Sequence, residues 1–205
     1  MDVAVSRGGI VHPWPFDDER GAAADAVRLG AVLSRRRKDA RDGLSLSPVS
    51  LMGVQPGMRI VLPSPNGAVL SFGAARTLNR VPVLAGCFRN AVAVARMARA
   101  MAGSRAVGVI AAGERWPDGS LRPAIEDWLG AGAILDRLHW PCSPEAEVAR
   151  ETYRAAGNRL AYLARVSISG RELVDAGFAG DVDLAVEEDV SGTVPELRNG
   201  AYRNA

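Results

Sequence analysis

Apolar and polar segments alternate along most of this chain in the order that is typical of α/β proteins. Residues 10–16 can run extended, and the two prolines among them restrict this segment to the edge of a sheet or the end of a strand. A helix is expected next, capped by Asp17 or Asp18 and stopped at Gly30. The first thirty residues therefore predict one strand and one helix.

A unit of apolar strand, polar turn and helix then occurs three times. The strands are expected at residues 58–62, 81–85 and 106–112, and their nearly continuous apolar character is typical of strands covered on both faces. The helices that follow are expected at residues 68–77, between 91 and 101, and between 123 and 138. This repetition predicts a sheet with crossover helices, the arrangement of an α/β fold.

The C-terminal third of the chain is predicted to be helical. Ser143 is a good N-cap residue with proline directly after it, so a helix is expected from there to about position 163. Residues 169–172 fit a capping box, and residues 181–187 can form a further short helix. No linker rich in proline, glycine or serine divides the sequence, so residues 1–205 are expected to form a single domain.

Three polar side chains directly follow the three predicted strands. These are Asn66, Asn90 and Glu114. In an open α/β sheet, ligands bind beyond the carboxyl ends of the strands. We therefore expect these three side chains to lie at one rim of one sheet and to share a cleft.

The turns after the first two strands contain groups that can bind anions. Asn66 and Gly67 precede a helix whose backbone amides suit a phosphate or sulfonate, and the alternative is a plain Asn-Gly turn. Arg89 can make a bidentate contact with an anion, and Asn90 can either orient that anion or cap a helix. Cys87 has no paired base at a recognisable position, so a buried small thiol is favoured over a nucleophile.

Two adjacent carboxylates, Glu126 and Asp127, begin the third predicted helix. Neighbouring residues on a helix diverge by about 100°, so both cannot readily point into one cleft. One of them could ligate a metal while the other caps or pairs, and the alternative is the ordinary preference of helix N-termini for acidic residues. Gly130 and Gly132 weaken the same helix, and close packing against the sheet would explain them.

Composition narrows the possible partners and location. The net charge of +2 gives no reason to expect a nucleic acid or a membrane as partner. Cys87 and Cys142 follow no zinc or redox spacing, so free thiols in a reducing cytoplasm are expected. No apolar run approaches the ~20 residues that span a bilayer, and the first residues lack the apolar core of a signal peptide. The basic run at 35–38 is interpreted as a solvated loop, with phosphate binding as the alternative.

The motifs occur in an order that is more specific than any one of them. They are the segments 45–48, 65–67, 85–91, 111–114 and 126–133, with further matches at 169–173, 176–178, 181–182 and 194–195. The series resembles the 2-phosphosulfolactate phosphatase (ComB-like) family in its bacterial form. The resemblance extends over residues 9–200, approximately.

The resemblance implies a three-layer α/β/α fold with a largely parallel or mixed central sheet. It also implies a magnesium-dependent phosphatase that converts 2-phospho-3-sulfolactate to sulfolactate and phosphate, with a homodimer as one possible assembly. Mg²⁺ would lie between one or two carboxylates, the phosphate and water, and would polarise the phosphoryl group. Catalytic duties are then assigned to Glu114, Glu126 and Asp127, metal binding to Glu126 and Asp127, and ligand binding to Asn66, Gly67, Arg89 and Asn90.

The start of the chain departs from the family pattern. Members usually begin with an apolar strand that carries an aspartate and turns into the first helix, whereas the first nine residues here look like the later half of that helix. We therefore expect an N-terminally short chain that lacks a central strand and one site carboxylate and has impaired catalysis. The alternatives are a non-catalytic anion-binding relative and a phosphatase for another small phosphorylated acid.

Overall fold

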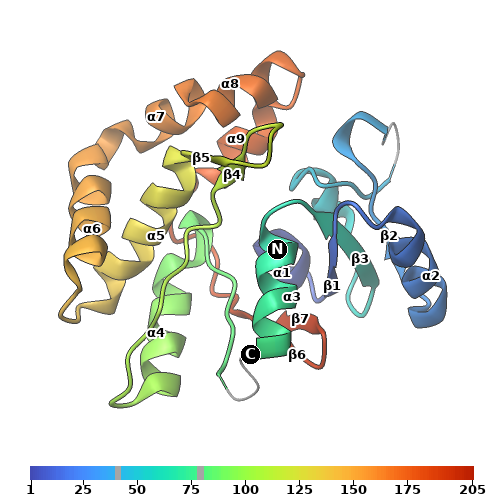
Figure 1. Cartoon of the computed structure of the whole chain (residues 1–205), viewed down its shortest axis with the longest axis horizontal. Coiled ribbons are helices and arrows are strands. Elements are labelled where there is room, and N and C mark those ends of the chain that lie inside the picture. The colour runs from blue at the N-terminus through green and yellow to red at the C-terminus, as the bar shows by residue number, and fades with distance from the viewer. Residues whose placement is uncertain (40–42, 78–80) are drawn as a thin grey trace. The chain divides into compact units, whose positions relative to one another are not determined.

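The computed structural model describes residues 1–39, 43–77 and 81–205 (Figure 1). The chain forms two compact units, each with its own set of internal contacts. The first unit contains residues 1–85 and 193–205, and the second contains residues 86–192. The expected grouping of residues 1–205 into a single domain stays a prediction.

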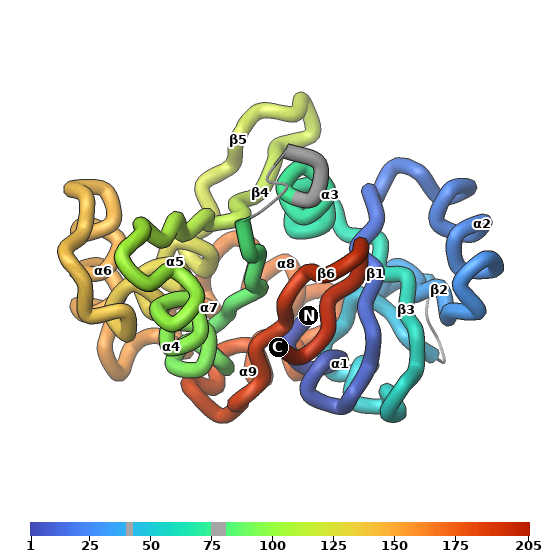
Figure 2. The backbone as a smooth tube through the Cα atoms, turned by 90° about the horizontal axis from the view of Figure 1, so that it is seen from below, coloured from blue at the N-terminus to red at the C-terminus, as the bar shows by residue number. Residues whose placement is uncertain are grey.

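The first unit is built on a five-stranded sheet whose strands lie side by side in Figure 2. Their order across the sheet is β2 (Val32–Leu33), β3 (Arg59–Ser64), β1 (Ile10–Pro15), β7 (Ala201–Asn204) and β6 (Pro195–Arg198). β1, β2 and β3 are parallel, whereas β7 and β6 are antiparallel to their neighbours. The predicted α/β class and the mixed sheet are confirmed.

The strand β1 occupies the middle of the sheet and ends at Pro15, so of the two predicted places for its prolines the sheet edge is wrong and the strand end is confirmed for Pro15. β1 pairs with β3 along its whole length, including Pro13 opposite Leu62. Its pairing with β7 is confined to Val11 and Tyr202, before either proline. N–H groups two residues apart face the same side of a strand, so Pro13 and Pro15 remove donors from one neighbour alone. A central strand can therefore carry both prolines.

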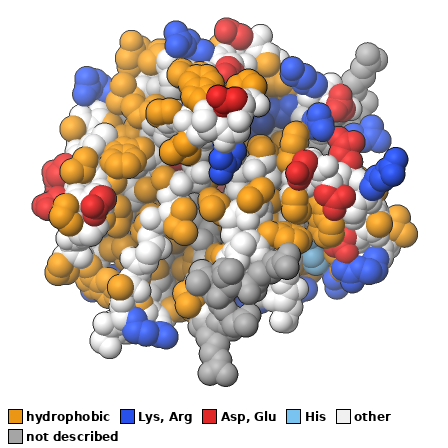
Figure 3. Space-filling model, in the orientation of Figure 1, with side chains coloured by type: hydrophobic (Ala, Val, Ile, Leu, Met, Phe, Trp, Pro, Cys, Tyr) orange, Lys and Arg blue, Asp and Glu red, His pale blue; other side chains and the backbone are white. Residues whose placement is uncertain are grey.

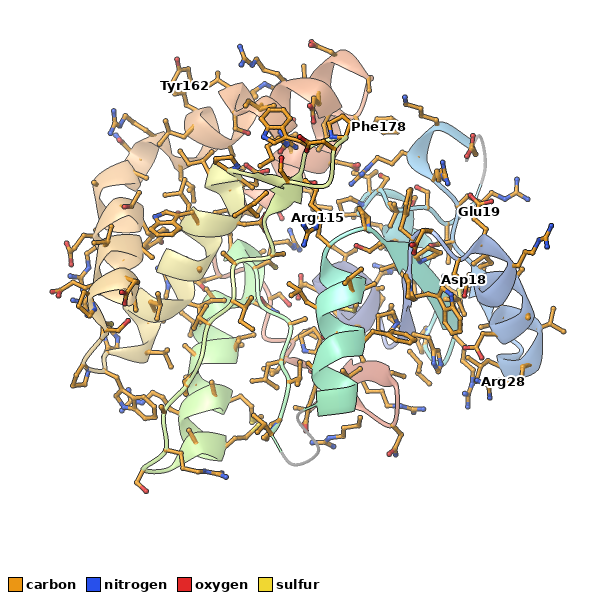
Figure 4. All side chains as sticks on the ribbon, viewed as in Figure 1. Asp18, Glu19, Arg28, Arg115, Tyr162 and Phe178 are labelled. Atoms are coloured by element: carbon orange, nitrogen blue, oxygen red, sulfur yellow. The ribbon has the colours of Figure 1, made fainter. Side chains whose placement is uncertain are left out.

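Three helices belong to the first unit: α1 (Asp2–Ser6), α2 (Glu19–Leu29) and α3 (Gly67–Thr77). The predicted boundaries of α2 are confirmed, because Asp18 Oδ1 accepts a hydrogen bond from Gly21 N at 2.9 Å and Gly30 is left-handed with φ of 58°. Figure 4 shows Asp18 and Glu19 at the start of this helix and Arg28 near its end. That distribution of charge complements the helix dipole. Short 3₁₀ turns occupy Arg37–Asp39 and Ser50–Gly53.

The predicted strand at residues 81–85 is reduced to a single bridge. Leu84 pairs antiparallel with Glu196 of β6, with hydrogen bonds from Ala85 N to Pro195 O and from Leu197 N to Val83 O. An apolar run forms a strand only over the length for which a neighbour pairs with its backbone. The expected parallel strand is therefore replaced by a short antiparallel contact.

The second unit is mainly helical, and Figure 1 shows α4, α5 and α6 side by side. Its core contains Phe88, Leu129, Leu135, Leu138 and Leu160. The elements are α4 (Ala91–Ala102), β4 (Glu114–Arg115), β5 (Leu121–Arg122), α5 (Ile125–Leu138), α6 (Pro144–Ala156), α7 (Leu160–Val166), α8 (Ile168–Asp175) and α9 (Ala179–Ala185), with 3₁₀ turns at Phe88–Asn90 and Gly157–Arg159. The helices predicted at 91–101 and 123–138 are confirmed.

The third predicted strand, at residues 106–112, is wrong. These residues form no strand, although Val107 and Val109 are half-buried and pack against the helical core. Their apolar side chains are covered, but the only strands among the described residues of this unit are β4 and β5, which pair with each other. Burial of side chains without a paired backbone leaves an extended connection instead of a strand.

Local signals in the C-terminal third were partly confirmed. Ser143 caps α6 by accepting a hydrogen bond from Ala146 N, as predicted. The helix ends at Gly157, whose φ of 46° interrupts the continuous helix expected to position 163. The capping box at 169–172 is wrong, because Ser167 caps α8 by accepting a hydrogen bond from Gly170 N at 3.0 Å.

The two glycines of α5 differ in their surroundings. A Cβ at Gly132 would lie 2.3 Å from Ala149 O, so this glycine permits the close approach of α6. The expectation that Gly132 packs against the sheet is therefore wrong. Nothing in the structure explains Gly130, which has open space around it.

The surface carries charges of both signs. Acidic and basic side chains are interspersed with apolar ones on the face shown in Figure 3. No helix in the described part of the chain combines the length and apolar character needed to cross a membrane. Cys87 and Cys142 form no disulfide, as expected, but both are half-buried, so the expected burial of Cys87 is only partial.

Candidate functional site

Three of the predicted site carboxylates gather at the hairpin of the second unit. Glu114 lies on β4, and β5 returns the chain antiparallel to it before α5 begins. Glu126 and Asp127 lie in the first turn of α5. The hairpin therefore brings Glu114 within electrostatic reach of the other two carboxylates.

The crowding of these carboxylates is most evident at Asp127. Burial, together with the negative charges of Glu126 and Glu114, raises the pKa of this carboxyl to about 6. A hydrogen bond from the Gly113 backbone N–H acts in the opposite direction and lowers the pKa. The local environment therefore disfavours three negative charges unless a cation is near them.

The adjacent carboxylates of α5 face different surroundings. Glu126 lines a cavity of about 450 Å³, whereas Asp127 accepts the hydrogen bond from Gly113. This divergence follows the 100° rotation per residue of a helix. The cavity is further lined by Pro123, Ala124, Ile125, Trp128, Val166, Ser167, Ile168, Ser169 and Arg171.

The donor chemistry of this region fits magnesium. Mg²⁺ prefers oxygen ligands and is usually held by one or two carboxylates together with phosphate and water. The like-charge crowding at Asp127 is relieved by a divalent cation. Within the described residues, no group of three or more His, Cys, Asp or Glu side chains is arranged to hold a metal by itself. A site here would therefore depend on substrate oxygens as well, and because the two side chains diverge, one of Glu126 and Asp127 would hold the ion.

Asn90 is fully buried and binds within its own turn. Its Oδ1 accepts hydrogen bonds from Cys87 N at 2.8 Å and from Cys87 Sγ at 3.4 Å. Asn90 precedes α4, but its side chain makes no capping bond to that helix. The role of Asn90 in ligand binding stays a prediction.

Arg89 is engaged with the chain that follows α9. Its guanidinium forms an ion pair with Glu187, and Nη1 donates a hydrogen bond to Leu184 O at 3.2 Å. The side chain of Arg89 is largely buried. An anion at Arg89 would have to compete with Glu187, and this role too stays a prediction.

Asn66 and Gly67 lie in the first unit, between β3 and α3. Leu70 N donates to Asn66 O, and Ser71 Oγ donates to Gly67 O at 2.6 Å, so both residues help to form the first turn of α3. Asn66 follows a strand of the sheet, as expected, whereas Asn90 and Glu114 do not. Asn90 and Glu114 therefore lack the parallel strands on which their predicted place at one rim of the sheet depended. A cleft common to Asn66 and the residues of the second unit stays a prediction.

The basic run at 35–38 borders a cavity of about 410 Å³ in the first unit. Arg36 donates to Glu19 Oε1 at 2.6 Å and lies 4.6 Å from the centre of the Phe16 ring. The charge of Arg36 is therefore already paired. Arg35, Arg36 and Lys38 are exposed, so the interpretation of the run at 35–38 as a solvated segment is confirmed.

Arg122 is the residue near the carboxylates that sequence reasoning missed. It lies on β5 directly opposite Glu114 and is buried, with 6% of its surface exposed. The Asp118–Gly119 pair is a turn signal in the sequence, and a hairpin around it would have placed these two residues opposite each other. Burial of an arginine in a two-residue strand, however, has no signal in the sequence.

Comparison with known proteins identifies the relatives of this chain. A family model described as 2-phosphosulpholactate phosphatase matches residues 42–200. A probable 2-phosphosulfolactate phosphatase of Deinococcus radiodurans is 34% identical over 162 residues, which cover 77% of this chain and 64% of that protein. A protein of the same description from Thermotoga maritima is 32% identical over 82 residues, or 40% of this chain and 36% of the relative. The chain thus spans less than two thirds of the length of these relatives.

Proposed function

Because this chain belongs to the 2-phosphosulpholactate phosphatase family, we propose that it hydrolyses 2-phospho-3-sulfolactate to sulfolactate and phosphate, with Mg²⁺ as cofactor. The observation that supports this proposal most directly is the family match itself, because residues 42–200 include all seven predicted site residues. The matched relatives are both described as probable 2-phosphosulfolactate phosphatases.

The arrangement of carboxylates in the second unit supports a metal-assisted mechanism. One of Glu126 and Asp127 would hold Mg²⁺, and Glu114 would accept the proton of the attacking water. When bound, Mg²⁺ would neutralise charge on the phosphoryl oxygens and so favour attack by water. Glu126 lines the cavity, and this position supports a role for Glu126 in binding.

The free thiol of Cys87 has no part in this proposal. Its Sγ donates to Asn90 Oδ1, and attack by water needs no thiolate. We further propose a cytoplasmic location, and either a monomer or a homodimer as the working assembly, with neither nucleic acid nor membrane as partner.

A phosphate-release assay tests the proposed function. The protein is incubated with a panel of phosphorylated hydroxy acids, with Mg²⁺ and with EDTA, and 2-phospho-3-sulfolactate is expected to be the best substrate. Magnesium binding is measured separately by calorimetry. Release from a different acid would favour the alternative substrate, and binding of the acid without release would favour a non-catalytic relative.

A further inference from the structure

The cavity of about 410 Å³ in the first unit lies at the carboxyl ends of three parallel strands. Among its lining residues, Phe16 directly follows β1, Arg35 lies two residues after β2, and Pro63 is the last but one residue of β3. Glu19 at the start of α2 (Figure 4) lines the cavity as well. In open α/β sheets this is the edge at which ligands bind. The position of the cavity therefore predicts a ligand site within the first unit.

Arg35 presents a positive charge to this cavity. Ser34 N donates to Val61 O at 2.9 Å, and Arg35 then forms a parallel bridge with Ser45, so the backbone stays extended beyond β2. Side chains alternate along an extended backbone, so Arg35 projects to the same side as Leu33, which also lines the cavity. Among the described residues, no carboxylate forms an ion pair with Arg35. Its charge is therefore available to a ligand.

The other charged groups of the cavity wall are one ion pair and one carboxylate. Arg36 Nη2 lies 2.6 Å from Glu19 Oε1, but both side chains are more than half exposed, and exposed ion pairs contribute little to stability. Asp39 also lines the cavity, at the end of a 3₁₀ turn. Within the part of the chain that the structure describes, Asp39 forms no ion pair, either with Arg35 or with another residue. Arg35 and Asp39 thus line one cavity as a cation and an anion that do not meet.

This pair of charges selects the chemistry of a ligand. An arginine only donates hydrogen bonds, and an ionised carboxylate only accepts them. A ligand that satisfies both must carry an anionic oxygen and an O–H group. Monohydrogen phosphate and a singly protonated phosphate monoester have both, whereas sulfate at neutral pH has no O–H. The apolar part of the wall, which includes Phe16, Leu33 and Leu46, can cover the carbon atoms of a monoester.

We infer that this cavity binds a protonated phosphate group, with Arg35 donating to its anionic oxygens and Asp39 accepting its O–H. The ligand class is inorganic phosphate or a small phosphate monoester. The inference concerns the first unit alone and does not rest on the proposed function. The competing explanation is a cavity filled by solvent, in which both charges are merely hydrated.

The first test compares two basic side chains of the same run. Binding of inorganic phosphate to the full chain is measured by calorimetry at pH 6.5 in EDTA, so that no metal-held phosphate at the carboxylates of the second unit contributes. Arg35→Gln should weaken binding at least tenfold. Lys38→Gln should weaken it less than twofold, because Lys38 is exposed but does not line the cavity. Equal losses in the two variants would show attraction by the whole run and overturn the inference.

Sulfate tests the part assigned to Asp39. The unaltered protein should bind phosphate at least tenfold more tightly than sulfate, because only phosphate has an O–H for the carboxylate. Asp39→Asn should reduce this preference at least threefold. Asp17→Asn, which removes an exposed carboxylate outside the cavity, should leave the preference unchanged. Sulfate bound as tightly as phosphate by the unaltered protein would overturn the inference.

A monoester and substrate turnover complete the experiment. Tighter binding of glycerol 2-phosphate than of inorganic phosphate would assign the site to monoesters, and weaker binding would assign it to free phosphate. No measurable binding of either by the unaltered protein would overturn the inference, even if the protein releases phosphate in the presence of Mg²⁺. Phosphate binding that depends on Arg35, in a protein that releases no phosphate from any acid in the panel, would support the inference and reject the proposed function.

Discussion

In the first unit, the buried polar atoms without partners belong to neutral side chains, whereas in the second unit they belong to arginines. Among the described residues of the first unit, the buried side-chain atoms without a hydrogen-bond partner are His12 Nε2 and Ser34 Oγ. Among those of the second unit they are Arg122 Nη1 and Arg150 Nε. Arg150 forms ion pairs with Glu147 and Glu151, so Arg122 is the less compensated of the two. Burial of a charge is far more costly than burial of a neutral group.

The two units also differ in how their backbones are paired. The five strands of the first unit pair with one another, so the sheet satisfies the peptide groups around His12 and Ser34. The second unit has a two-stranded hairpin and gains its core from helix packing. The contrast is consistent with the proposal that the carboxylates at the hairpin of the second unit bind the metal and the substrate.

Removing one charge of the second unit should give the largest effect. Glu126→Gln is expected to lower the rate of phosphate release by about 10²–10³-fold, the size of one preorganised electrostatic contact. The matched control is Glu147→Gln, because Glu147 also lies in the first turn of a helix in this unit and is exposed. The control should keep at least half of the rate. A Glu126→Gln variant with the rate of the unaltered protein would remove Glu126 from the site.

The helix packing of the second unit is tested at its two glycines. Gly132→Ala should destabilise the protein by about 1–3 kcal/mol, because its Cβ would meet Ala149 O at 2.3 Å and the Cβ of Tyr153 at 2.7 Å. Gly130→Ala meets nothing within 4 Å and should stabilise the protein by about 0.5–1 kcal/mol. Urea denaturation measures both changes. Equal effects of the two substitutions would contradict the close approach of α5 and α6.

The buried histidine of the first unit should make stability depend on pH. Burial lowers the pKa of His12 below its ordinary value of 6.5, and Arg59, Arg203 and Arg28 lower it too, while Asp25 raises it. The unfolded chain therefore takes up a proton before the folded protein does, so this group makes the protein lose stability as the pH falls through 6.5.

This pH dependence is checked by denaturation between pH 8 and pH 5.5 for the unaltered protein and His12→Gln. The loss of stability on acidification should be smaller in the variant. His139→Gln, which alters an exposed histidine at the end of α5, should leave the dependence unchanged. If His12→Gln shows the same dependence as the unaltered protein, burial of His12 has no energetic consequence.

The smallest effect is expected at Cys87. The hydroxyl of Cys87→Ser can donate to Asn90 Oδ1 as the thiol does, so the turn before α4 should be kept. Phosphate release should stay within a few-fold of the unaltered protein. Cys142→Ser serves as the control for a general loss of thiol. A decrease beyond a hundredfold in Cys87→Ser alone would argue for a covalent mechanism.

Much of the local structure could be predicted from neighbouring residues. Asp18 and Ser143 were identified as caps because a cap depends on a side chain and the N–H groups two or three residues further along. The strands expected at 81–85 and 106–112 failed for the opposite reason. A strand depends on a partner far away in the sequence, and one segment found a single bridge while the other formed no strand.

The sequence by itself determined the family, the caps of the helices and the residue types that supply carboxylates and cations. The tertiary structure decided which of them meet: Glu114 and Asp127 near each other, Gly132 against α6, and Arg122 buried behind Ser169. The physical reason is one of range. Capping and motif chemistry depend on residues within one turn, whereas burial and like-charge crowding depend on how the hairpin and the helices pack.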